Sequence, residues 1–477
     1  MKRTTRPFAI GIALLLASGL GGISLRDAQA KPSGYTFSLI ATLGDPLPGP
    51  QGGTFVNDFE PGGLNSNGDV AFGADANTGG EGVFLRPHNG HGQITELGRT
   101  GDAAPGGGTF EFSFLGPVGL NDQGDMVFDF LLKDFTLPVG VNAGAYRYSH
   151  TTHSVTPVVI PFITPAPGLG KFQGVGFQPT INNRGDTAFP GVVETDKGVH
   201  VPGEDYVGLG IGIFRADAKG QILTVVVPGD AAPGIGKKFD VAGEPWINDG
   251  GDVSFIGHIA GTEAVAPGFP PQAQLIGALG SLYVKEGGTG KIYTIVQSGD
   301  PAPGGGHFRA ALHDVMNNRG DIVFNGDLTP PPDFNQNFGV FLYSSGKITA
   351  VALPGDQMPG GGKLVNASLV GANVHINNPG DVVFSGVLDT DVDGDGLPDT
   401  GLFQWSHGQL SGIARTGTVV PGVGTVKLLG SPTQIIFPLP PNFTATSGAI
   451  NNDVGQVLFQ ATLTDDSGVF LLATPRP

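Results

Sequence analysis

A phrase of nine residues recurs along this chain and limits what the chain can fold into. It reads INNRGDTAF at residues 181–189, MNNRGDIVF at residues 316–324, and LNSNGDVAF, INDGGDVSF and INNPGDVVF elsewhere. Seven copies align on one glycine: Gly68, Gly124, Gly185, Gly251, Gly320, Gly380 and, in a copy lengthened by one residue, Gly455. Neighbouring copies are 56 to 75 residues apart. Such a period predicts one supersecondary unit per repeat, stacked on its neighbours to share a core.

Each repeat contains four short strand signals. In the fifth repeat these are residues 307–316, 321–328, 338–345 and 347–354, separated by turns rich in Asn and Gly. Four short antiparallel strands per repeat are typical of a propeller blade. The sequence therefore predicts an all-β fold for residues 31–477, a seven-bladed β-propeller of four-stranded blades.

The two ends of the chain each carry part of one blade. Residues 35–43 resemble the fourth strand of a repeat, but no first three strands precede them. The chain ends with SGVFLLA, which resembles the third strand of a repeat and has no fourth strand after it. We expect residues 35–43 to complete the sheet of residues 425–473 and close the ring, because closure removes exposed sheet edges. An open β-solenoid is the alternative, but it does not explain why the strand missing at one end is surplus at the other.

Turn-forming residues are abundant, with 81 Gly and 39 Pro among 477 residues. This share approaches that of disordered chains, yet 31 Phe recur at fixed offsets and indicate buried positions in a folded chain. The chain has no Cys. Neither disulfides nor a lipid-anchored N-terminal Cys can form, so stability depends on burial, ring closure or metal.

The first thirty residues have the pattern of an export signal. Lys2, Arg3 and Arg6 precede an apolar run at residues 8–25, and small residues end the segment. A retained membrane helix is the alternative, although Gly19, Gly21 and Gly22 interrupt the run. Removing the signal leaves 21 basic and 41 acidic residues, a charge of −20, which argues against nucleic acid or an anionic membrane as partner. We expect a monomer that is secreted, periplasmic or at the cell surface, with no membrane span after signal removal.

The residue types of the phrase have local structural reasons. Asn at the first turn position can accept a bond from the backbone NH two residues on, and Gly tolerates the positive φ of a tight hairpin. The Phe four residues after Gly can pack between blades. The Asp after Gly, which completes Arg-Gly-Asp at residues 184–186 and 319–321, suggests a catalytic or adhesion motif, but turn chemistry already explains a polar residue there. We interpret the phrase as scaffolding.

The phrase alternates with loops such as GDAAPGGGTF, GDPAPGGGHF and GDQMPGGGKL. In this combination the chain resembles a family of exported bacterial proteins that carry a tandem Asn-x-x-Gly-x-x-Phe repeat. The resemblance covers essentially the whole chain after the signal. It implies a propeller-like fold and export, and it supplies no catalytic residue. Family members often end in a C-terminal sorting segment, whereas this sequence ends in ATPRP, so we expect release rather than anchoring.

Strand parity places the Gly-Asp-x-x-Pro-Gly loops and the long insertions on one face, the upper face. Variable loops on one face of a rigid scaffold commonly carry binding. The Asp of these loops occupies equivalent positions, with Thr in two degenerate copies. These residues are Asp45, Asp102, Asp230, Asp300 and Asp356, with Thr164 and Thr418. They either cap the turn before Pro, or form a carboxylate ring that binds cations or a polyhydroxylated ligand.

The most specific chemical signal is DTDVDGDGLPDTG, in the insertion at residues 387–400. Alternating carboxylates can surround a hard cation while Gly permits the sharp bend. The pattern matches calcium loops of thrombospondin type 3 and dockerin-like repeats. We expect one structural Ca²⁺ bound by Asp391, Asp393, Asp395, Asp399 and the carbonyl of Leu397. The alternative is a solvated acidic loop.

Signals for catalysis are few. The pairs with ligand-like spacing are His88 with His91 and His150 with His153, and neither lies in a helix, so we expect no zinc site. Carboxylates that could form a pair for glycoside cleavage are Glu194, Asp196, Glu204, Asp205 and Glu263. We interpret the protein as a binding or interaction module for an extracellular glycan or a cell-surface protein rather than an enzyme. The alternative is a hydrolase or lyase of an extracellular polysaccharide.

Overall fold

The computed structural model describes residues 34–88, 92–112, 119–133, 143–176, 178–195, 209–259, 280–330, 337–367, 374–430 and 448–476. Across these ranges the chain forms strands and turns and no helix, which confirms the all-β prediction. None of the described segments is therefore a helix able to cross a lipid bilayer. The predicted signal, residues 1–30, lies outside the described residues.

The repeating unit is a four-stranded antiparallel sheet. Two repeats form it separately, in the orders β2-β3-β4-β5 and β20-β21-β22-β23. Their strands are β2 (Phe55–Leu64), β3 (Val70–Ala76), β4 (Glu81–Arg86), β5 (Thr95–Arg99), β20 (His307–Met316), β21 (Ile322–Thr329), β22 (Phe338–Ser344) and β23 (Lys347–Ala352). Strands β20 to β23 agree within two residues with those predicted for the fifth repeat.

The same strand order continues in a 14-stranded sheet and a five-stranded sheet. The larger sheet contains β6 (Phe110–Phe112), β7 (Gly119–Leu120), β8 (Met126–Leu132), β9 (Ala143–Ser149), β10 (Ser154–Val159), β11 (Phe172–Val175), β12 (Thr180–Ile181), β13 (Thr187–Glu194), β14 (Leu209–Ala216), β15 (Ile222–Val226), β16 (Phe239–Ile247), β17 (Val253–Ile259), β18 (Ser281–Lys285) and β19 (Ile292–Val296). The smaller contains β24 (Leu364–Ala367), β25 (Val374–Ile376), β26 (Val382–Leu388), β27 (Thr400–Ser406) and β28 (Gln409–Arg415). Single pairings between neighbouring repeats, Val175 with Ala143 and Ile211 with Val241, join the larger sheet.

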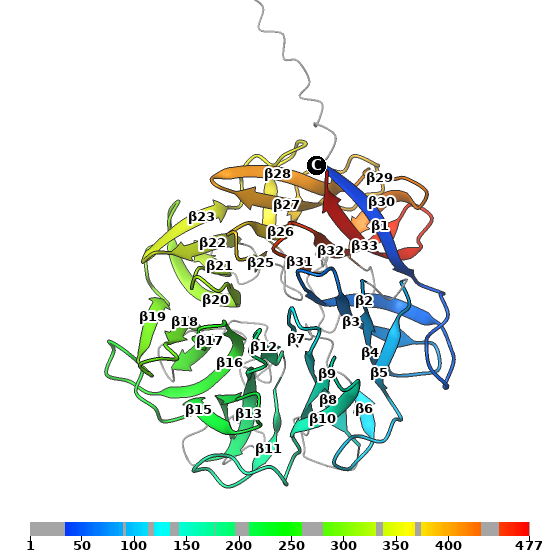
Figure 1. Ribbon diagram of the computed structural model, residues 1–477. Coiled ribbons are helices and arrows are strands. Elements are labelled where there is room, and N and C mark those ends of the chain that lie inside the picture. The colour runs from blue at the N-terminus through cyan, green and yellow to red at the C-terminus, as the bar shows by residue number, and fades with distance from the viewer. Residues whose placement is uncertain are drawn as a thin grey trace, which may run out of the picture.

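The last sheet contains both ends of the described chain. It is formed by β29 (Val419–Val420), β30 (Gly424–Leu429), β31 (Ala449–Asn451), β32 (Val457–Leu463), β33 (Gly468–Pro475) and β1 (Tyr35–Thr42). Strand β1 pairs antiparallel with β33, from Tyr35 opposite Pro475 to Thr42 opposite Val469. The predicted closure is therefore confirmed. Figure 1 shows these strands side by side in a propeller-like arrangement of sheets around a centre.

Aromatic residues fill the space within and between the sheets. The Phe of every phrase is buried: Phe72, Phe128, Phe189, Phe255, Phe324, Phe384 and Phe459. In the fifth repeat Phe308, Phe324 and Phe341 pack with ring centroids 4.8 to 5.9 Å apart. Gly326 makes room for them, because a Cβ there would lie 2.7 Å from both Phe308 and Phe341. Phe324 also shares a core cluster with Ile256 and Leu282 of the preceding repeat, which confirms the predicted packing between blades.

The Asn turns join neighbouring repeats at the centre. Asn65 accepts bonds from the backbone NH groups of Asn67 and Asp69 through Oδ1, and its Nδ2 donates to the carbonyl of Asn121 at 3.0 Å. The equivalent amide-to-carbonyl bonds are Asn121 to Asn182, Asn182 to Asn248, Asn317 to Asn377, Asn377 to Asn452, and Asn452 to Asn65. The exception is Asn248, whose Nδ2 lies 4.0 Å from Sδ of Met316. The bond from Asn452 to Asn65 closes the circle.

The seventh copy of the phrase corrects one detail of the sequence interpretation. Asn452 occupies the turn position, and Gly455 follows at the usual spacing with φ of 77°. The copy is therefore not lengthened. Instead, Asn451 stands where the other copies place an apolar residue such as Leu64 or Ile376.

The Asp residues of the phrase also have structural roles. Asp69 accepts the backbone NH of His88 at 2.8 Å, and so holds the next hairpin of its own repeat. In the Arg-Gly-Asp segment at residues 184–186, Arg184 pairs with Asp186 at 3.0 Å, and Arg215 pairs with the same carboxylate at 2.6 Å. Burial raises the pKa of Asp186, but Arg215 and the hydrogen bonds outweigh it and hold the pKa below its ordinary value. These contacts support the interpretation as scaffolding.

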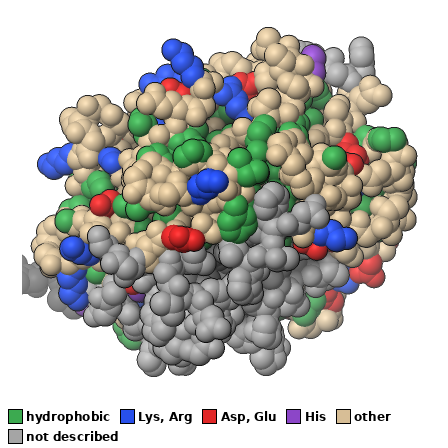
Figure 2. Space-filling model, turned by 90° about the horizontal axis from the view of Figure 1, so that it is seen from below, with side chains coloured by type: hydrophobic (Ala, Val, Ile, Leu, Met, Phe, Trp, Pro, Cys, Tyr) green, Lys and Arg blue, Asp and Glu red, His purple; other side chains and the backbone are tan. Residues whose placement is uncertain are grey.

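Charge is not concentrated on the side of the molecule seen in Figure 2. There, Lys, Arg, Asp and Glu side chains are scattered among uncharged ones over the described surface. A basic stripe of the kind that binds nucleic acid is not seen on that side.

Candidate functional site

A pocket lies at the centre of the ring, where the Asn turns meet. Its volume is about 140 Å³, close to the size of a cavity that holds benzene. The apolar lining includes Trp246, Met316 and Ile450, and the polar lining comes from turn residues of every copy. None of the described lining residues is Lys or Arg, while Asp122, Asp249 and Asp453 are among them. The pocket is therefore polar at its rim and negatively charged.

The second residue of six of the seven turns takes part in a further series of hydrogen bonds around the pocket. Its side-chain oxygen accepts the backbone NH of the preceding turn, as Asp122 accepts from Ser66 at 2.8 Å. The same bond joins Asp122 to Asn183, Asn183 to Asp249, Asp249 to Asn318, Asn318 to Asn378, and Asn378 to Asp453, each at 2.8 Å. The Nδ2 of Asn183 also donates to Asp122 and Asp249, at 3.1 Å each. Two connected rings of hydrogen bonds make the rim rigid.

Two aromatic side chains from different repeats meet at the pocket. Trp246 lies on β16 and His375 on β25, with the repeat of β20 between them in the chain. Their ring centroids are 5.5 Å apart in an edge-to-face arrangement. Small residues, Gly62, Gly63 and Gly119, line other parts of the same pocket. One part of the pocket wall is thus formed by large aromatic side chains, and another part by glycines.

His375 is held by a buried amide. Its Nδ1 lies 2.8 Å from Oδ1 of Asn451, and Nδ2 of Asn451 donates to the carbonyl of Asp381 at 2.9 Å. Burial lowers the pKa of His375 to about 4, opposed by the bond to Asn451 and the attraction of Asp453. The imidazole is therefore neutral at neutral pH. Sequence reasoning missed both residues, although Asn451 at an apolar position of the phrase was a usable signal.

Buried acidic groups accompany the inner strands near this pocket. Glu244, two residues before Trp246, accepts the backbone NH of His313 at 2.7 Å. Both residues have φ of 50°. Burial raises the pKa of Glu244 to about 8, and burial together with repulsion from Glu244 raises that of Asp314 to about 8. They are not among the residues that line the pocket.

The Asp residues of the Gly-Asp-x-x-Pro-Gly loops cap turns. Each accepts the backbone NH three residues earlier, at 2.8 to 3.0 Å: Asp45 from Thr42, Asp102 from Arg99, Asp230 from Val227, Asp300 from Gln297 and Asp356 from Leu353. Thr164 and Thr418 accept from Ile160 and Arg415 at 2.8 Å. These turns follow β1, β5, β15, β19 and β23, outer strands in Figure 1. The turn-capping alternative is thus met at all seven positions.

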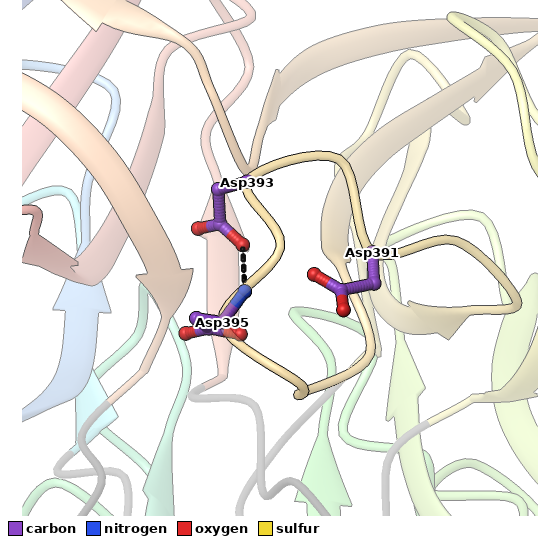
Figure 3. A group of neighbouring side chains, drawn as sticks. All are labelled: Asp391, Asp393 and Asp395. Carbon is purple, nitrogen blue, oxygen red and sulfur yellow. Dashed lines mark hydrogen bonds between the residues drawn. The ribbon is translucent and has the colours of Figure 1, made fainter.

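The acidic insertion brings three of its predicted ligands together. Carboxylate oxygens of Asp391, Asp393 and Asp395 lie within 4.8 Å of one another, on exposed side chains (Figure 3). Oxygens of Asp391 accept backbone NH groups of Gly394 and Gly396, at 2.8 and 3.1 Å. This is the only such group of three acidic or histidine ligands found within the described residues.

The other two predicted ligands of this loop lie differently. Asp399 is buried, accepts the backbone NH of Val392 at 3.1 Å, and has its other oxygen 3.6 Å from Nη2 of Arg415. The side chain of Leu397 is exposed, and its backbone NH donates to Asp395 at 2.8 Å. The structure thus places Asp399 beside an arginine and outside the group of three.

A lysine lies near the same acidic group. Lys427 donates to Asp466 at 2.8 Å. That hydrogen bond and the attraction of Asp466 raise the pKa of Lys427, and Asp395 and Asp393 add to the increase. A cation bound in the loop would therefore experience some repulsion from Lys427.

The remaining candidates are only partly within the described residues. Glu194 is exposed at the end of β13, while Asp196, Glu204, Asp205 and Glu263 lie outside the described residues, as does His91. His150 and His153 have ring centroids 5.6 Å apart, and Nδ1 of His153 lies 3.0 Å from the hydroxyl of Tyr148. They line a second cavity of about 430 Å³ with Leu85, Glu96 and neighbours.

Comparison with known proteins gives a family and a set of distant structural likenesses. The model of a family of unknown function (DUF7453) matches residues 19–477. No curated protein matches the chain in sequence.

Among solved structures, an oligogalacturonate lyase from Vibrio parahaemolyticus has 10% identity and a TM-score of 0.49, with 94% of each chain covered. An oligogalacturonate lyase in complex with manganese has 14% identity and a TM-score of 0.47, with 94% of this chain and 98% of the other covered. The β-propeller domain of the trilobed protease from Pyrococcus furiosus has 10% identity and a TM-score of 0.44, with 88% and 95% covered. At these values the likenesses say nothing about activity.

Proposed function

The chain belongs to a family of unknown function (DUF7453), and from its own geometry we propose that it is a binding module whose central pocket takes a small polar ligand. The observation that carries this proposal is the pocket itself, about 140 Å³, where Trp246 and His375 meet inside a ring of turns joined by six amide-to-carbonyl hydrogen bonds. Polar groups fixed at a rigid concave site are what selective binding of small molecules requires.

We propose that the ring has seven blades. The support is the set of seven Asn turns, each of which begins the second strand of a four-stranded unit. The links from turn to turn return from Asn452 to Asn65, so the count of turns and the count of units are the same. We also propose export, on the strength of the predicted signal at residues 1–30.

The charge of the pocket limits the ligand class. Three carboxylates and no Lys or Arg line it among the described residues, so anions are repelled and neutral or cationic molecules are favoured. A lyase that acts on uronic acids must offset the carboxylate of its substrate, and this pocket supplies no positive side chain for that task. Neutral glycan fragments and polyols fit the geometry better than acidic polysaccharides do.

Replacing Trp246 with Leu should weaken ligand binding about tenfold, because an aromatic wall inside a desolvated pocket carries a large share of binding energy. The measurement is calorimetry or NMR titration of the mature protein with neutral polyols, small amines, uronates and phosphates. Trp405→Leu is the matched control, since Trp405 is the other tryptophan and is not among the lining residues. Stronger binding of uronates than of neutral sugars, or equal affinities in both variants, would contradict the proposal.

We further propose one structural Ca²⁺ at Asp391, Asp393 and Asp395, with Asp399 supporting the loop from its buried position. The three exposed carboxylates face a common point, and hard oxygen ligands at this spacing suit Ca²⁺. The nearby ammonium of Lys427 competes with the ion. The role of the ion is to order the insertion, because the insertion is not part of the repeated core.

Calcium should raise the melting temperature. If loop order is coupled to folding, the gain in stability is about 2.7 kcal/mol when the free ion concentration is a hundredfold above the Kd. The Asp393→Ala and Asp395→Ala double variant should lose calorimetric binding and remain folded. Asp389→Asn, in the same insertion but outside the group, is the control, and Lys427→Ala should bind calcium more tightly. No heat of binding and no protection of residues 389–400 from proteolysis at millimolar calcium would overturn the proposal.

A further inference from the structure

The orientation of one buried amide fixes the proton on His375. Nδ2 of Asn451 donates to the carbonyl of Asp381 at 2.9 Å, and only a donor can occupy that position. Oδ1 of Asn451 therefore faces Nδ1 of His375, 2.8 Å away. Because Oδ1 is an acceptor, Nδ1 must carry the proton. In a neutral imidazole the proton is then absent from Nε2.

The surroundings keep the imidazole neutral. Asp453 is the charged group that acts on His375, and burial outweighs its attraction. The other charged residues that line the pocket in the described part of the chain are Asp122 and Asp249, which are engaged in the rim. Trp246 packs edge-to-face against the imidazole. Nε2 is thus a lone-pair acceptor on a side chain that lines the central pocket.

The rest of the pocket is also rich in acceptors. The Nδ2 groups of six of the seven turn asparagines donate to backbone carbonyls of the next turn. The backbone NH groups at the rim donate to side-chain oxygens of neighbouring turns. Most donors are therefore consumed by the two rings, and a ligand must bring its own.

We propose that Nε2 of His375 accepts a hydrogen bond from the ligand, and that the pocket selects donor-rich, uncharged polyhydroxy compounds. This inference rests on the proposed function of the pocket. Asn451 is a positioning residue that sets the tautomer, and His375 is the residue that touches the ligand. A polyol whose hydroxyl groups are all methylated should not bind, because it would bury Nε2 of His375 without a hydrogen-bond donor.

The tautomer can be read without any ligand. In ¹⁵N-histidine-labelled protein, His375 should show a protonated Nδ1 and an unprotonated Nε2 from pH 5 to pH 8. Asn451→Leu introduces the residue that the first two copies carry at this position, so it should fold, and the single tautomer should be lost. A protonated Nε2 in the parent protein would overturn the inference.

The ligand test uses erythritol and its fully O-methylated ether, which has no hydroxyl donors and is larger by four methyl groups. Erythritol should shift the Nε2 resonance of His375, the ether should not bind, and His375→Phe should weaken erythritol binding about 3- to 10-fold. If erythritol shifts the signals of Trp246 while Nε2 and the His375→Phe affinity are unchanged, the pocket binds but this inference is wrong. If erythritol disturbs neither side chain, the polyol class is wrong for this pocket.

Discussion

Deletion of residues 31–44 is expected to cause aggregation or a large fall in melting temperature, greater than the fall that a typical single core substitution causes. The deletion removes β1, which pairs with β33 from Tyr35 to Thr42 and buries Tyr35, Ile40 and Ala41. Loss of this burial and of a full strand of backbone bonds should cost on the order of 5 kcal/mol or more, comparable to the whole stability of many domains. It also leaves β33 as an open edge that can pair with other chains.

A circular permutant is the matched control for this deletion. The backbone NH of Arg476 donates to the carbonyl of Gly34 at 2.6 Å, so the two ends lie side by side. Attaching residues 34–44 after residue 476 through a short turn would restore β1 as the second strand of a hairpin with β33. We expect the permutant to melt close to the parent. If the truncated protein itself melted like the parent, the strand would contribute nothing to closure.

The features that could be predicted from the sequence are those repeated in it. The phrase fixes Asn, Gly and Phe at positions whose roles are local, so their hydrogen bonds, positive φ values and burial follow from turn chemistry and strand parity. Closure followed from a count of strands, since β1 supplies what the last unit lacks. Because the phrase occurs seven times, each inference about it rests on several copies.

The features that could not be predicted depend on departures from the repeat or on position in the ring. Trp246 and His375 are single residues on inner strands, and an isolated aromatic or His in an apolar stretch is usually core. Their contact arises only because the ring brings β16 and β25 to one centre. Asn451 was interpreted as an insertion because the alignment used Gly alone. The five loop Asp are equivalent in sequence, but they follow outer strands and satisfy their own turns.

Substitution of Asp129 with Asn should raise the free energy of unfolding at pH 8 by an amount on the order of 5 kcal/mol, and should change it little at pH 4. Asp129 follows the buried Phe128 on β8 and is itself buried, and no partner is found for its Oδ2 among the described residues. Burial raises its pKa from 3.8 to about 8. In the fifth repeat the equivalent position carries Asn325, so the fold accepts an amide there.

The sign of the pH dependence follows from the direction of this shift. The folded state holds the proton of Asp129 up to about pH 8, whereas the unfolded state releases it near pH 4. The contribution to stability is therefore complete below pH 4 and is lost as pH rises through 8.

Urea unfolding at pH 4, 6 and 8 should show a smaller loss of stability with rising pH for Asp129→Asn than for the parent. Some loss should remain, because the pKa values of Glu244 and Asp314 are also raised to about 8. Asp466→Asn, at an exposed position, is the control and should follow the parent. An equal gain at all three pH values would show that the substitution acts through packing and that Asp129 does not titrate in this range.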